Sequence, residues 1–476
     1  KGDIDAGIES YEMALKIKPD YQAARADKLH QQSQICDWSA LEQDRDLIAR
    51  LGVSTEAIEP FAALALEDAP ERHRVRSELY TKKNYGNKTP LPSIIAPLQK
   101  PKRLRIGYFS ADFNEHPVAY LIAKVLEIHD HKNFEVYGYS IGSPIDDNMR
   151  HRLIKAFDVF NDVDFMSDRD VALLARQNKI DIAIDLMGYT KNSRPGIFFY
   201  RAAPVQISYL GYPGSMGADF IDYIIADLTL IPVKNQKYYS EKPIYLPHHY
   251  QAQDDTLLIS DEIPSRHTLG LPEEGFIFCA INNSYKITMT EFDIWMRILS
   301  KVEGSVLWLL ESNQWAKINL LKEAQARGIA EQRLIFAKRV NHKQYLAQFK
   351  IADLYLDSFY YNAGATASNA LWAGLPVLTK PGEGYTARMA ASLLSSIDLS
   401  ELVTHSLKEY ESLALELATN PQRLSEIRNT LAENRLSTPL FNTALYTKHL
   451  ENGYEQAYQR YYDGKQPKAI TVTEDC

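Results

Sequence analysis

Cysteine is scarce in this chain: its 476 residues include only Cys36, Cys279 and Cys476. Their odd number, wide separation and lack of any CxxC pair argue against a disulfide framework or a zinc site. No apolar run reaches the ~18 to 20 residues that a membrane-spanning helix requires, and the N-terminus lacks the pattern of a signal peptide. These absences predict free thiols and a cytoplasmic protein with no membrane partner.

The sequence also lacks an excess of positive charge. Lys and Arg number 53 against 61 Asp and Glu, and the net charge of −8 is spread along the chain. Without a basic patch or tail we expect no nucleic-acid partner. The hydrophobic fraction of 45% and the charged fraction of 24% are those of an ordinary globular protein, long enough for about three structural units.

Several familiar catalytic motifs are missing. The sequence contains no GxxxxGK[ST], no HExxH, no GxSxG and no GxGxxG after a first strand. Kinase, zinc protease and serine esterase readings therefore lose their support. We expect no metal ion in the site.

The N-terminal region has the pattern of a repeat helix. Between Gly2 and Ala24 the apolar residues fall on one helical face, and Pro19 ends the helix. This segment is similar to the second helix of a tetratricopeptide repeat, although any amphipathic helix would show the same periodicity. A half-repeat cannot bury its apolar face alone, so we expect further repeats upstream of a partial repeat at 1–36. A helical linker region, 37–98, ends in a proline-rich stretch.

The rest of the chain alternates between short apolar strands and helices. This rhythm is typical of parallel sheets covered on both faces, and it is interrupted near 246–266 and then restarts. We therefore predict an α/β fold with two doubly wound, Rossmann-like lobes at 99–255 and 256–440, followed by a C-terminal helix and tail at 441–476. The predicted strands are 104–110, 134–140, 180–186 and 205–210 in the first lobe, and 276–280, 305–310, 334–337, 354–357 and 376–379 in the second.

In open α/β sheets, ligands bind beyond the carboxyl ends of the strands. In the first lobe, His116 follows the first strand, where an imidazole can accept a proton or donate a hydrogen bond. The alternative is that Asp112 or His116 only caps the next helix. A turn at 210–217 holds three glycines and a proline, so its backbone amides can approach a ligand closely, or it is simply a tight turn.

In the second lobe, Lys286 follows the strand 276–280 and is placed to neutralise a diphosphate, unless it is an ordinary solvated lysine. Small residues begin the helix after strand 354–357, where free N–H groups and the helix dipole form an anion site. A close-packed turn is the alternative there. We expect Asn282, Tyr285, Gly364, Ala365, Thr366 and Ala367 to line this ligand site, and Glu383 could bind a ribose or sugar hydroxyl.

Six short stretches together carry a family resemblance. They are Phe109–Pro117, Arg201–Gln206 with Leu210–Gly214, Asn282–Lys286, Val306–Leu310, Leu371–Gly374 and Pro439–Thr443. On these residues the chain resembles the catalytic region of the tetratricopeptide-containing O-linked N-acetylglucosamine transferases and their plant SPINDLY relatives. The resemblance runs to about Gly464, and the absence of the long insertion of animal members suggests a bacterial form.

The resemblance implies a GT-B fold and an inverting transfer of N-acetylglucosamine from the nucleotide sugar UDP-GlcNAc to Ser or Thr hydroxyls of a protein or peptide acceptor. It implies no further cofactor. By the same resemblance, His116 matches the active-site histidine and Lys286 the lysine that stabilises the departing diphosphate. Leu210, Gly211 and Pro213 would border the sugar pocket.

The sequence also departs from the family pattern. Gly364, Ala365 and Thr366 replace the usual His-Thr-Thr at the phosphate-binding helix, and Asn369 replaces the ribose-binding aspartate. Tyr345, which could stack on a base, replaces a histidine near the nucleotide. These departures leave two alternatives: the same fold using GDP-fucose or a CMP-linked nonulosonic acid, and a repeat-bearing adaptor that has lost catalysis.

Overall fold

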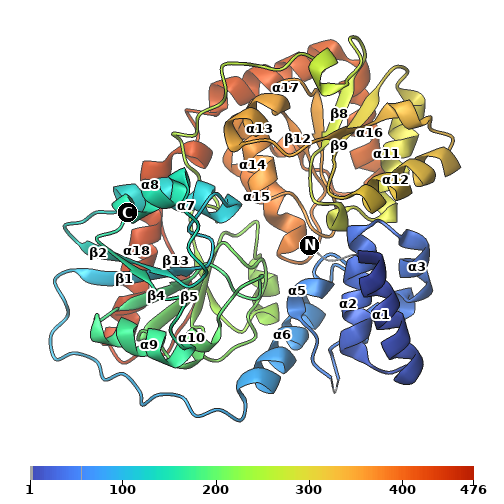
Figure 1. The fold of residues 1–476 in the computed structure, drawn as a ribbon. Coiled ribbons are helices and arrows are strands. Elements are labelled where there is room, and N and C mark those ends of the chain that lie inside the picture. Colours follow the sequence, from blue (N-terminus) through green and yellow to red (C-terminus); the bar gives the residue numbers. More distant parts are fainter. Residues whose placement is uncertain (1–3, 55, 476) are drawn as a thin grey trace. The chain divides into compact units, whose positions relative to one another are not determined.

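A computed structural model describes residues 4–54 and 56–475 of the chain (Figure 1). The predicted start of the first helix at Gly2 and the predicted free thiol of Cys476 lie outside the described residues. Cys36 and Cys279 are free and buried, as expected.

The chain divides into two compact units. Unit 1 comprises the residues up to Ile58, Ala62–Ala69 and Leu257–Thr438. Unit 2 comprises Glu59–Phe61, Pro70–Thr256 and the residues from Pro439 onward. Each unit is built around one sheet.

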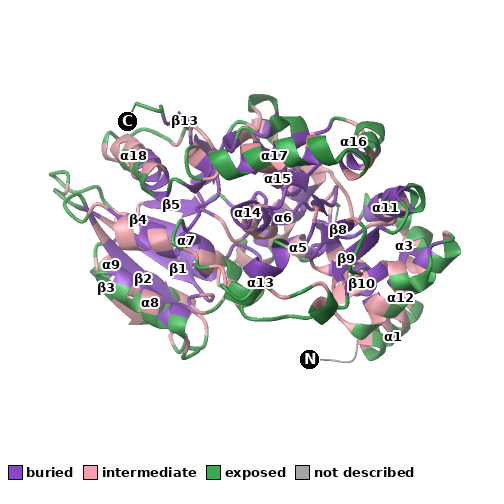
Figure 2. Ribbon diagram, turned by 90° about the horizontal axis from the view of Figure 1, so that it is seen from above, coloured by how far each residue is buried: buried purple, intermediate pink, exposed green. Residues whose placement is uncertain are grey.

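Unit 2 contains an eight-stranded parallel sheet in the order β13-β7-β6-β5-β4-β1-β2-β3, counted over the described residues. The strands are β1 (Leu104–Ser110), β2 (Phe134–Ser140), β3 (Val159–Asp162), β4 (Ile182–Asp185), β5 (Val205–Ser208), β6 (Tyr223–Ala226), β7 (Lys242–Tyr245) and β13 (Ile470–Thr471). The central strands are buried (Figure 2) because helices cover both faces of a parallel sheet.

The helices of unit 2 supply the rest of its core. They are α6 (Pro70–Tyr85), α7 (Pro117–Ile128), α8 (Asn148–Ala156), α9 (Asp168–Gln177), α10 (Gly196–Phe199) and α18 (Thr443–Tyr462). Although α18 comes from the end of the chain, it packs on α7, β5 and β13. Its buried tyrosines join the apolar residues of β1 and β4 in one cluster.

Unit 1 contains a five-stranded parallel sheet in the order β10-β9-β8-β11-β12, again over the described residues. The strands are β8 (Ile277–Ala280), β9 (Val306–Leu310), β10 (Leu334–Ala337), β11 (Leu354–Leu356) and β12 (Val377–Leu378). The helices around it are α11 (Met289–Lys301), α12 (Gln314–Ala326), α13 (His342–Phe349), α14 (Ala365–Trp372), α15 (Met389–Ser396), α16 (Leu407–Thr419) and α17 (Pro421–Asn434).

The N-terminal helices also belong to unit 1. They are α1 (Ile4–Ile17), α2 (Gln22–Gln34), α3 (Trp38–Gln43) and α4 (Arg45–Ile48), and the short α5 (Pro60–Ala63) follows. As predicted, the first helix ends before Pro19, and α1 packs against α2. Two hydrogen bonds join this region to the turn after β8. Ser284 Oγ donates to Gln34 O at the end of α2 at 2.6 Å, and Trp38 Nε1 at the start of α3 donates to Ile287 O at 3.1 Å.

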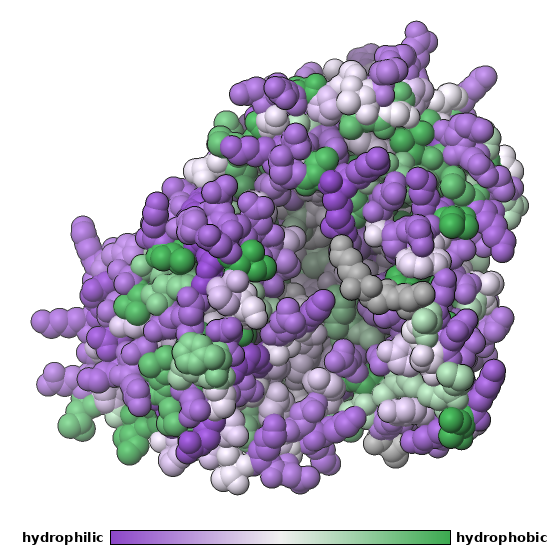
Figure 3. Space-filling view, in the orientation of Figure 1, coloured by the Kyte–Doolittle hydropathy of each residue, from purple (hydrophilic) through white to green (hydrophobic). Residues whose placement is uncertain are grey.

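The predicted fold class is confirmed: two parallel, doubly wound sheets are preceded by a helical segment. The predicted strand bounds were most accurate where apolar runs were long. For β1 and β2 they match the observed bounds. It missed β3, an exposed edge strand whose sequence Val-Phe-Asn-Asp has no sustained apolar run. It also missed the short strands β6, β7 and β13. The face in Figure 3 is mainly hydrophilic, and the described residues contain no helix long and apolar enough to cross a membrane.

The attachment of α18 gives a stability prediction. Glu451 Oε1 accepts from Asp130 N at 2.7 Å and pairs with His129 Nδ1 at 2.8 Å, and the His129 side chain is fully buried. Glu451→Ala leaves both buried donors without that acceptor, so we expect a loss of ~2 to 3 kcal/mol. Urea unfolding checks this. Glu455→Ala, one turn further along and exposed, is the control and should change stability by less than ~0.5 kcal/mol; equal losses in both variants would contradict the prediction.

Candidate active site

His116 lies where β1 gives way to α7. It is the N-cap residue of α7, and its Nδ1 accepts a hydrogen bond from Val118 N at 3.4 Å. The same Nδ1 lies 3.4 Å from Asp112 Oδ2. His116 therefore does cap the helix, as the alternative predicted. The cap uses only Nδ1, so Nε2 takes no part in it, and 40% of the side chain is exposed.

The two contacts of His116 Nδ1 exclude one another. When Nδ1 accepts from Val118, the neutral ring carries its proton on Nε2 and donates there. When Nδ1–H instead donates to Asp112, Nε2 is free to accept a proton. Burial lowers the pKa of His116, and the nearby Asp112 carboxylate opposes that shift. The neutral ring can therefore serve as a hydrogen-bond donor or as a base.

In the glycine-rich turn after β5, the backbone at Gly211 passes very close to the backbone at Leu186. A Cβ on Gly211 would lie 1.8 Å from Leu186 O, so no other residue fits. Its neighbour Leu210 has φ +68°, in the left-handed region that L-residues rarely adopt. Such strain is retained at functional sites more often than elsewhere. Pro213 follows in the same turn, between the buried Tyr212 and Gly214.

Asp185 is a group that the sequence reasoning missed. It ends β4 beside β1, and its Oδ1 accepts from Met187 N at 2.9 Å and Gly188 N at 3.1 Å. Its Oδ2 is buried without a hydrogen-bond partner among the described residues. Burial raises the pKa of Asp185 to about 6. The signal in the sequence was an aspartate that ends an otherwise apolar strand.

In unit 1, Lys286 occupies the turn that follows β8. Contrary to the alternative of a solvated surface lysine, it is buried, with 8% of its surface exposed. Its Nζ donates to Asn362 O at 3.2 Å and lies 4.1 Å from the centre of the Tyr361 ring. Burial lowers the pKa of Lys286 to about 8, while the charge of Asp357 opposes that shift.

Asp357, also missed from the sequence, holds the loop that Lys286 contacts. Its Oδ1 accepts from Ser358 N at 2.9 Å and Ala363 N at 2.7 Å, and its Oδ2 from Thr379 Oγ1 at 2.7 Å. Both carboxylate oxygens are therefore occupied by neighbours other than Lys286. The aspartate follows β11, which pairs with β8, so the loop and the Lys286 turn emerge at the same edge of the sheet.

The loop leads directly into α14. Its N-cap, Gly364, provides no side-chain cap, and the first N–H groups of a helix lack intrahelical partners. These amides belong to Ala365, Thr366 and Ala367. The structure thus brings Lys286 and the start of α14 together within one unit, through a loop of a few residues.

Two further donor-binding candidates lie on this edge. Asn282 also follows β8, and its buried Nδ2 has no hydrogen-bond partner among the described residues. The Tyr285 ring packs edge-on against Tyr361 at 5.8 Å, and burial raises the pKa of its hydroxyl to about 12.

Tyr345 and Asn369 form a connected pair. Burial raises the pKa of the Tyr345 hydroxyl, and the nearby side chains of Thr366 and Asn369 oppose that shift. Tyr345 is on α13 and the other two are on α14, so two of the departures from the family pattern are in contact.

Glu383 lies in the turn after β12. Asp68, another residue that the sequence analysis missed, fixes this turn by accepting from Glu383 N and Gly384 N, both at 2.7 Å. A Cβ on Gly382 would lie 2.0 Å from Asp68 Oδ2, so a larger residue there would displace the Asp68 carboxylate. The Glu383 residue itself is exposed. No group of three or more potential metal ligands lies together in the described residues.

Comparison with known proteins identifies the family. Residues 80–261 and 255–450 match Glycosyl transferase family 41. The chain belongs to this family.

Several relatives agree with this assignment. The probable UDP-N-acetylglucosamine–peptide N-acetylglucosaminyltransferase SEC of Arabidopsis thaliana is 36% identical over 380 residues, 79% of this chain and 39% of that protein. The SPINDLY protein of Petunia hybrida is 30% identical over 77% of this chain and 40% of its own length. The chain thus spans about two-fifths of the length of these relatives.

Solved structures support the fold. A lysine-to-methionine mutant of the Thermobaculum terrenum O-GlcNAc transferase superposes with a TM-score of 0.79 at 27% identity, covering 97% of this chain and 82% of that one. A sucrose-phosphate synthase from Thermosynechococcus elongatus, at 11% identity and a TM-score of 0.50, shares the fold alone. The chain therefore has a GT-B-like fold and is similar to protein O-GlcNAc transferases.

A buried carboxyl group of unit 1 predicts a pH effect on stability. Glu291 caps α11 by accepting from Thr288 N at 2.8 Å, and burial raises its pKa from 4.5 to about 7. Between pH 4.5 and 7 the unfolded chain has lost this proton while the folded chain retains it, so stability falls as the pH rises through that window. We expect Glu291→Gln to lose less stability than the unmodified chain over this range, as measured by urea unfolding at several pH values.

Glu411→Gln is the matched control. Arg297 lowers the pKa of Glu411, so its contribution has the opposite sign and increases as the pH rises. An unchanged slope in Glu291→Gln would contradict the assignment.

Proposed function

We propose that this chain transfers N-acetylglucosamine from UDP-GlcNAc to Ser or Thr hydroxyls of a protein or peptide, with inversion at the sugar. The observation that carries the proposal is the position of Lys286, a buried cation beside the start of α14 whose nearest carboxylate has both oxygens occupied. The names of the relatives, which specify a UDP-N-acetylglucosamine donor and a peptide acceptor, support the choice of substrates.

In the proposed reaction the acceptor oxygen bonds to the anomeric carbon as the bond from that carbon to the β-phosphate oxygen breaks. UDP leaves, and its diphosphate gains negative charge in the transition state. Lys286 and the amides of Ala365–Ala367 stabilise this charge, a contribution that is commonly the largest in such reactions. A protonated lysine is required, and a bound diphosphate favours protonation because opposite charge raises an ammonium pKa.

The acceptor proton needs a destination. His116 accepts it at Nε2 when its Nδ1–H donates to Asp112, or else donates from Nε2 to a substrate oxygen and positions it. Asp185, with its unpartnered Oδ2, is a second candidate base of unit 2. Leu210, Gly211 and Pro213 are assigned to the sugar and acceptor pocket.

UDP is the preferred nucleotide in this proposal. Tyr345 and Asn369 keep hydrogen-bonding groups where the family pattern has histidine and aspartate. The side chains of Asn282 and Tyr285, and the carboxylate of Glu383, complete the donor set. No metal ion is assigned.

The decisive variant is Lys286→Ala. We expect transfer to fall by at least ~100-fold, because loss of one oxyanion contact costs about 3 to 4 kcal/mol of barrier. Incorporation of radiolabelled N-acetylglucosamine into an acceptor peptide measures this. Lys317→Ala is the control, since Lys317 also lies over an aromatic ring of unit 1, Phe336, but belongs to no part of the site. Normal turnover in Lys286→Ala would refute the role of this lysine.

Calorimetric titration with UDP, GDP and CMP tests the donor. We expect UDP to bind most tightly, and Lys286→Ala to weaken it at least tenfold because a charge-assisted contact to the diphosphate is lost. Tightest binding of GDP or CMP would favour the fucose or nonulosonic acid alternative. Binding of none of the three would favour the non-catalytic adaptor.

A further inference from the structure

A cavity of about 420 Å³ lies in unit 2, at the edge of the sheet opposite to the candidate active site. Arg105, Asp181 and Pro204 line the cavity where β1, β4 and β5 begin. His116 and Gly211, in contrast, follow the ends of β1 and β5. The seven residues of β1 separate the two edges by roughly 20 Å. The cavity is therefore distinct from the site discussed above.

One wall of the cavity is an extended segment, residues 90–101, which we call the strap. Figure 1 shows it as part of the long connection from α6 to β1. Isolated polar contacts hold it in place: Arg176 Nη1 donates to Pro92 O at 2.7 Å, Tyr461 OH to Ile94 O at 3.4 Å, and Tyr462 OH to Leu98 O at 3.3 Å.

The charges on the cavity lining are unbalanced. Four cations line it, Arg103, Arg105, Arg176 and Lys179, against the single carboxylate of Asp181. Arg105 is neutralised by Glu135 at 2.8 Å, and Arg103 lies 4.0 Å from Asp158.

Arg176 and Lys179 have no such neutralising partner. Arg176 donates to the backbone oxygens of Pro92, Tyr200 and Arg201, and within the described part of the chain no carboxylate pairs with it or with Lys179. Carbonyl groups accept hydrogen bonds from the half-buried guanidinium of Arg176 but do not neutralise its positive charge, so this charge can pair with a bound anion.

The rest of the lining is apolar. Besides Gln99, it includes Ile94, Pro97, Ile180, Tyr458 and Tyr461. On the rim, Ile95 is 89% exposed, and Leu98 on the same strap is fully exposed. Exposed apolar side chains beside uncompensated cations match a ligand that has both an apolar and a negatively charged part, because burial of apolar surface on both partners favours binding.

We propose that this cavity binds an amphiphilic anion, a molecule with one carboxylate or similar head group on an apolar body. The head group pairs with Arg176 and Lys179, and the apolar body lies against the tyrosine rings and covers Ile95. This inference does not depend on the proposed transferase function.

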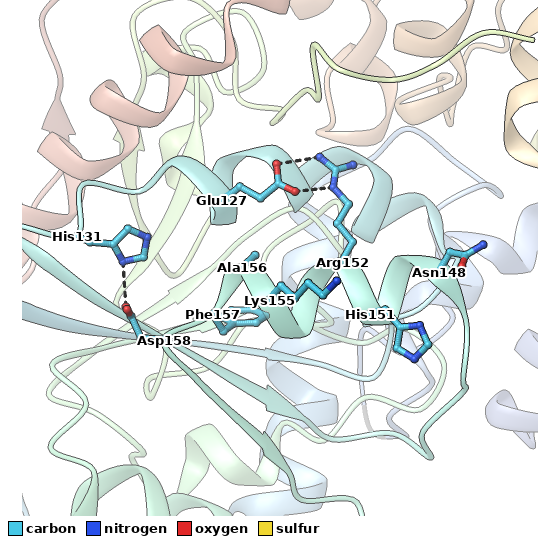
Figure 4. Close-up of a pocket in the computed structure, with 9 residues that line it drawn as sticks. All are labelled: Glu127, His131, Asn148, His151, Arg152, Lys155, Ala156, Phe157 and Asp158. Carbon is cyan, nitrogen blue, oxygen red and sulfur yellow. Dashed lines mark hydrogen bonds and ion pairs between the residues drawn. The ribbon is translucent and has the colours of Figure 1, made fainter.

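A larger cavity of about 580 Å³ lies between α7 and α8 and differs from this one in the balance of its charges (Figure 4). It is also lined by basic groups, but Arg152 pairs with Glu127 at 2.7 Å and with Asp254 at 2.6 Å, and His131 pairs with Asp158 at 3.1 Å. Its charges are largely cancelled, so it gives no comparable preference for an anion.

The test uses the complete chain and the fluorescent anion 1-anilinonaphthalene-8-sulfonate, with dodecanoate as competitor. We expect saturable fluorescence that dodecanoate displaces and that UDP leaves unchanged. Ile95→Glu adds a negative charge and removes an apolar contact at an exposed position, so folding is preserved and affinity should fall at least tenfold. Lys179→Asn suits the positive φ of +56° at that position and should weaken binding at least threefold.

Two matched control variants show whether the probe binds at this cavity or at other sites on the protein. Phe165→Glu changes another apolar residue that is 81% exposed, and Lys155→Asn changes a lysine of the Figure 4 cavity; both should bind the probe normally. Unchanged affinity in Ile95→Glu and Lys179→Asn would overturn the proposal, as would equal losses in the two matched variants. Displacement by an acidic peptide but not by dodecanoate would also overturn it, because the occupant would then be a peptide.

Discussion

The physical constraint on which the candidate site of unit 1 depends is the burial of one ammonium group, that of Lys286. A lysine removed from water tends to lose its proton unless negative charge or hydrogen bonds compensate. Here the compensation is partial: Lys286 has one carbonyl acceptor, one aromatic face and the distant charge of Asp357. Because the Asp357 oxygens are already bonded to the loop, the lysine has no close ion pair to break before it meets an anionic ligand. In the proposed function, the attraction that is left unsatisfied in the protein is available to a diphosphate.

This arrangement requires support from segments far apart in the sequence. The turn that carries Lys286 is bonded to the end of α2 through Ser284, 250 positions from Gln34. Likewise Asp68, in the helical region before the first sheet, fixes the turn that carries Glu383. The N-terminal region of unit 1 therefore holds both the turn that carries Lys286 and the turn that carries Glu383.

The sequence predicted the strands and the loops that carry chemistry, because apolar runs, glycine turns and small helix starts are local patterns. It located Lys286 and the Gly364–Ala367 helix start as separate features, and the structure joins them through Asn362. It did not identify Asp68, Asp185 or Asp357. An aspartate at the end of a strand is common in loops, and its role depends on which backbone amides fold back onto it. That information is in the tertiary structure alone.

The departures from the family pattern bear on whether this site has decayed. Most buried polar groups in folded proteins keep a hydrogen-bond partner. The buried Nδ2 of Asn282 has none among the described residues, so the question turns on the residues that differ from the family pattern. In this chain the side chains of Thr366 and Asn369 lie near the Tyr345 hydroxyl and lower its pKa, so residues 345 and 369 belong to one local group. Asparagine can both donate and accept, which suits a hydroxyl that burial keeps protonated. We interpret the exchange of histidine and aspartate for tyrosine and asparagine as a joint replacement, which favours the proposed transferase over the adaptor that has lost catalysis.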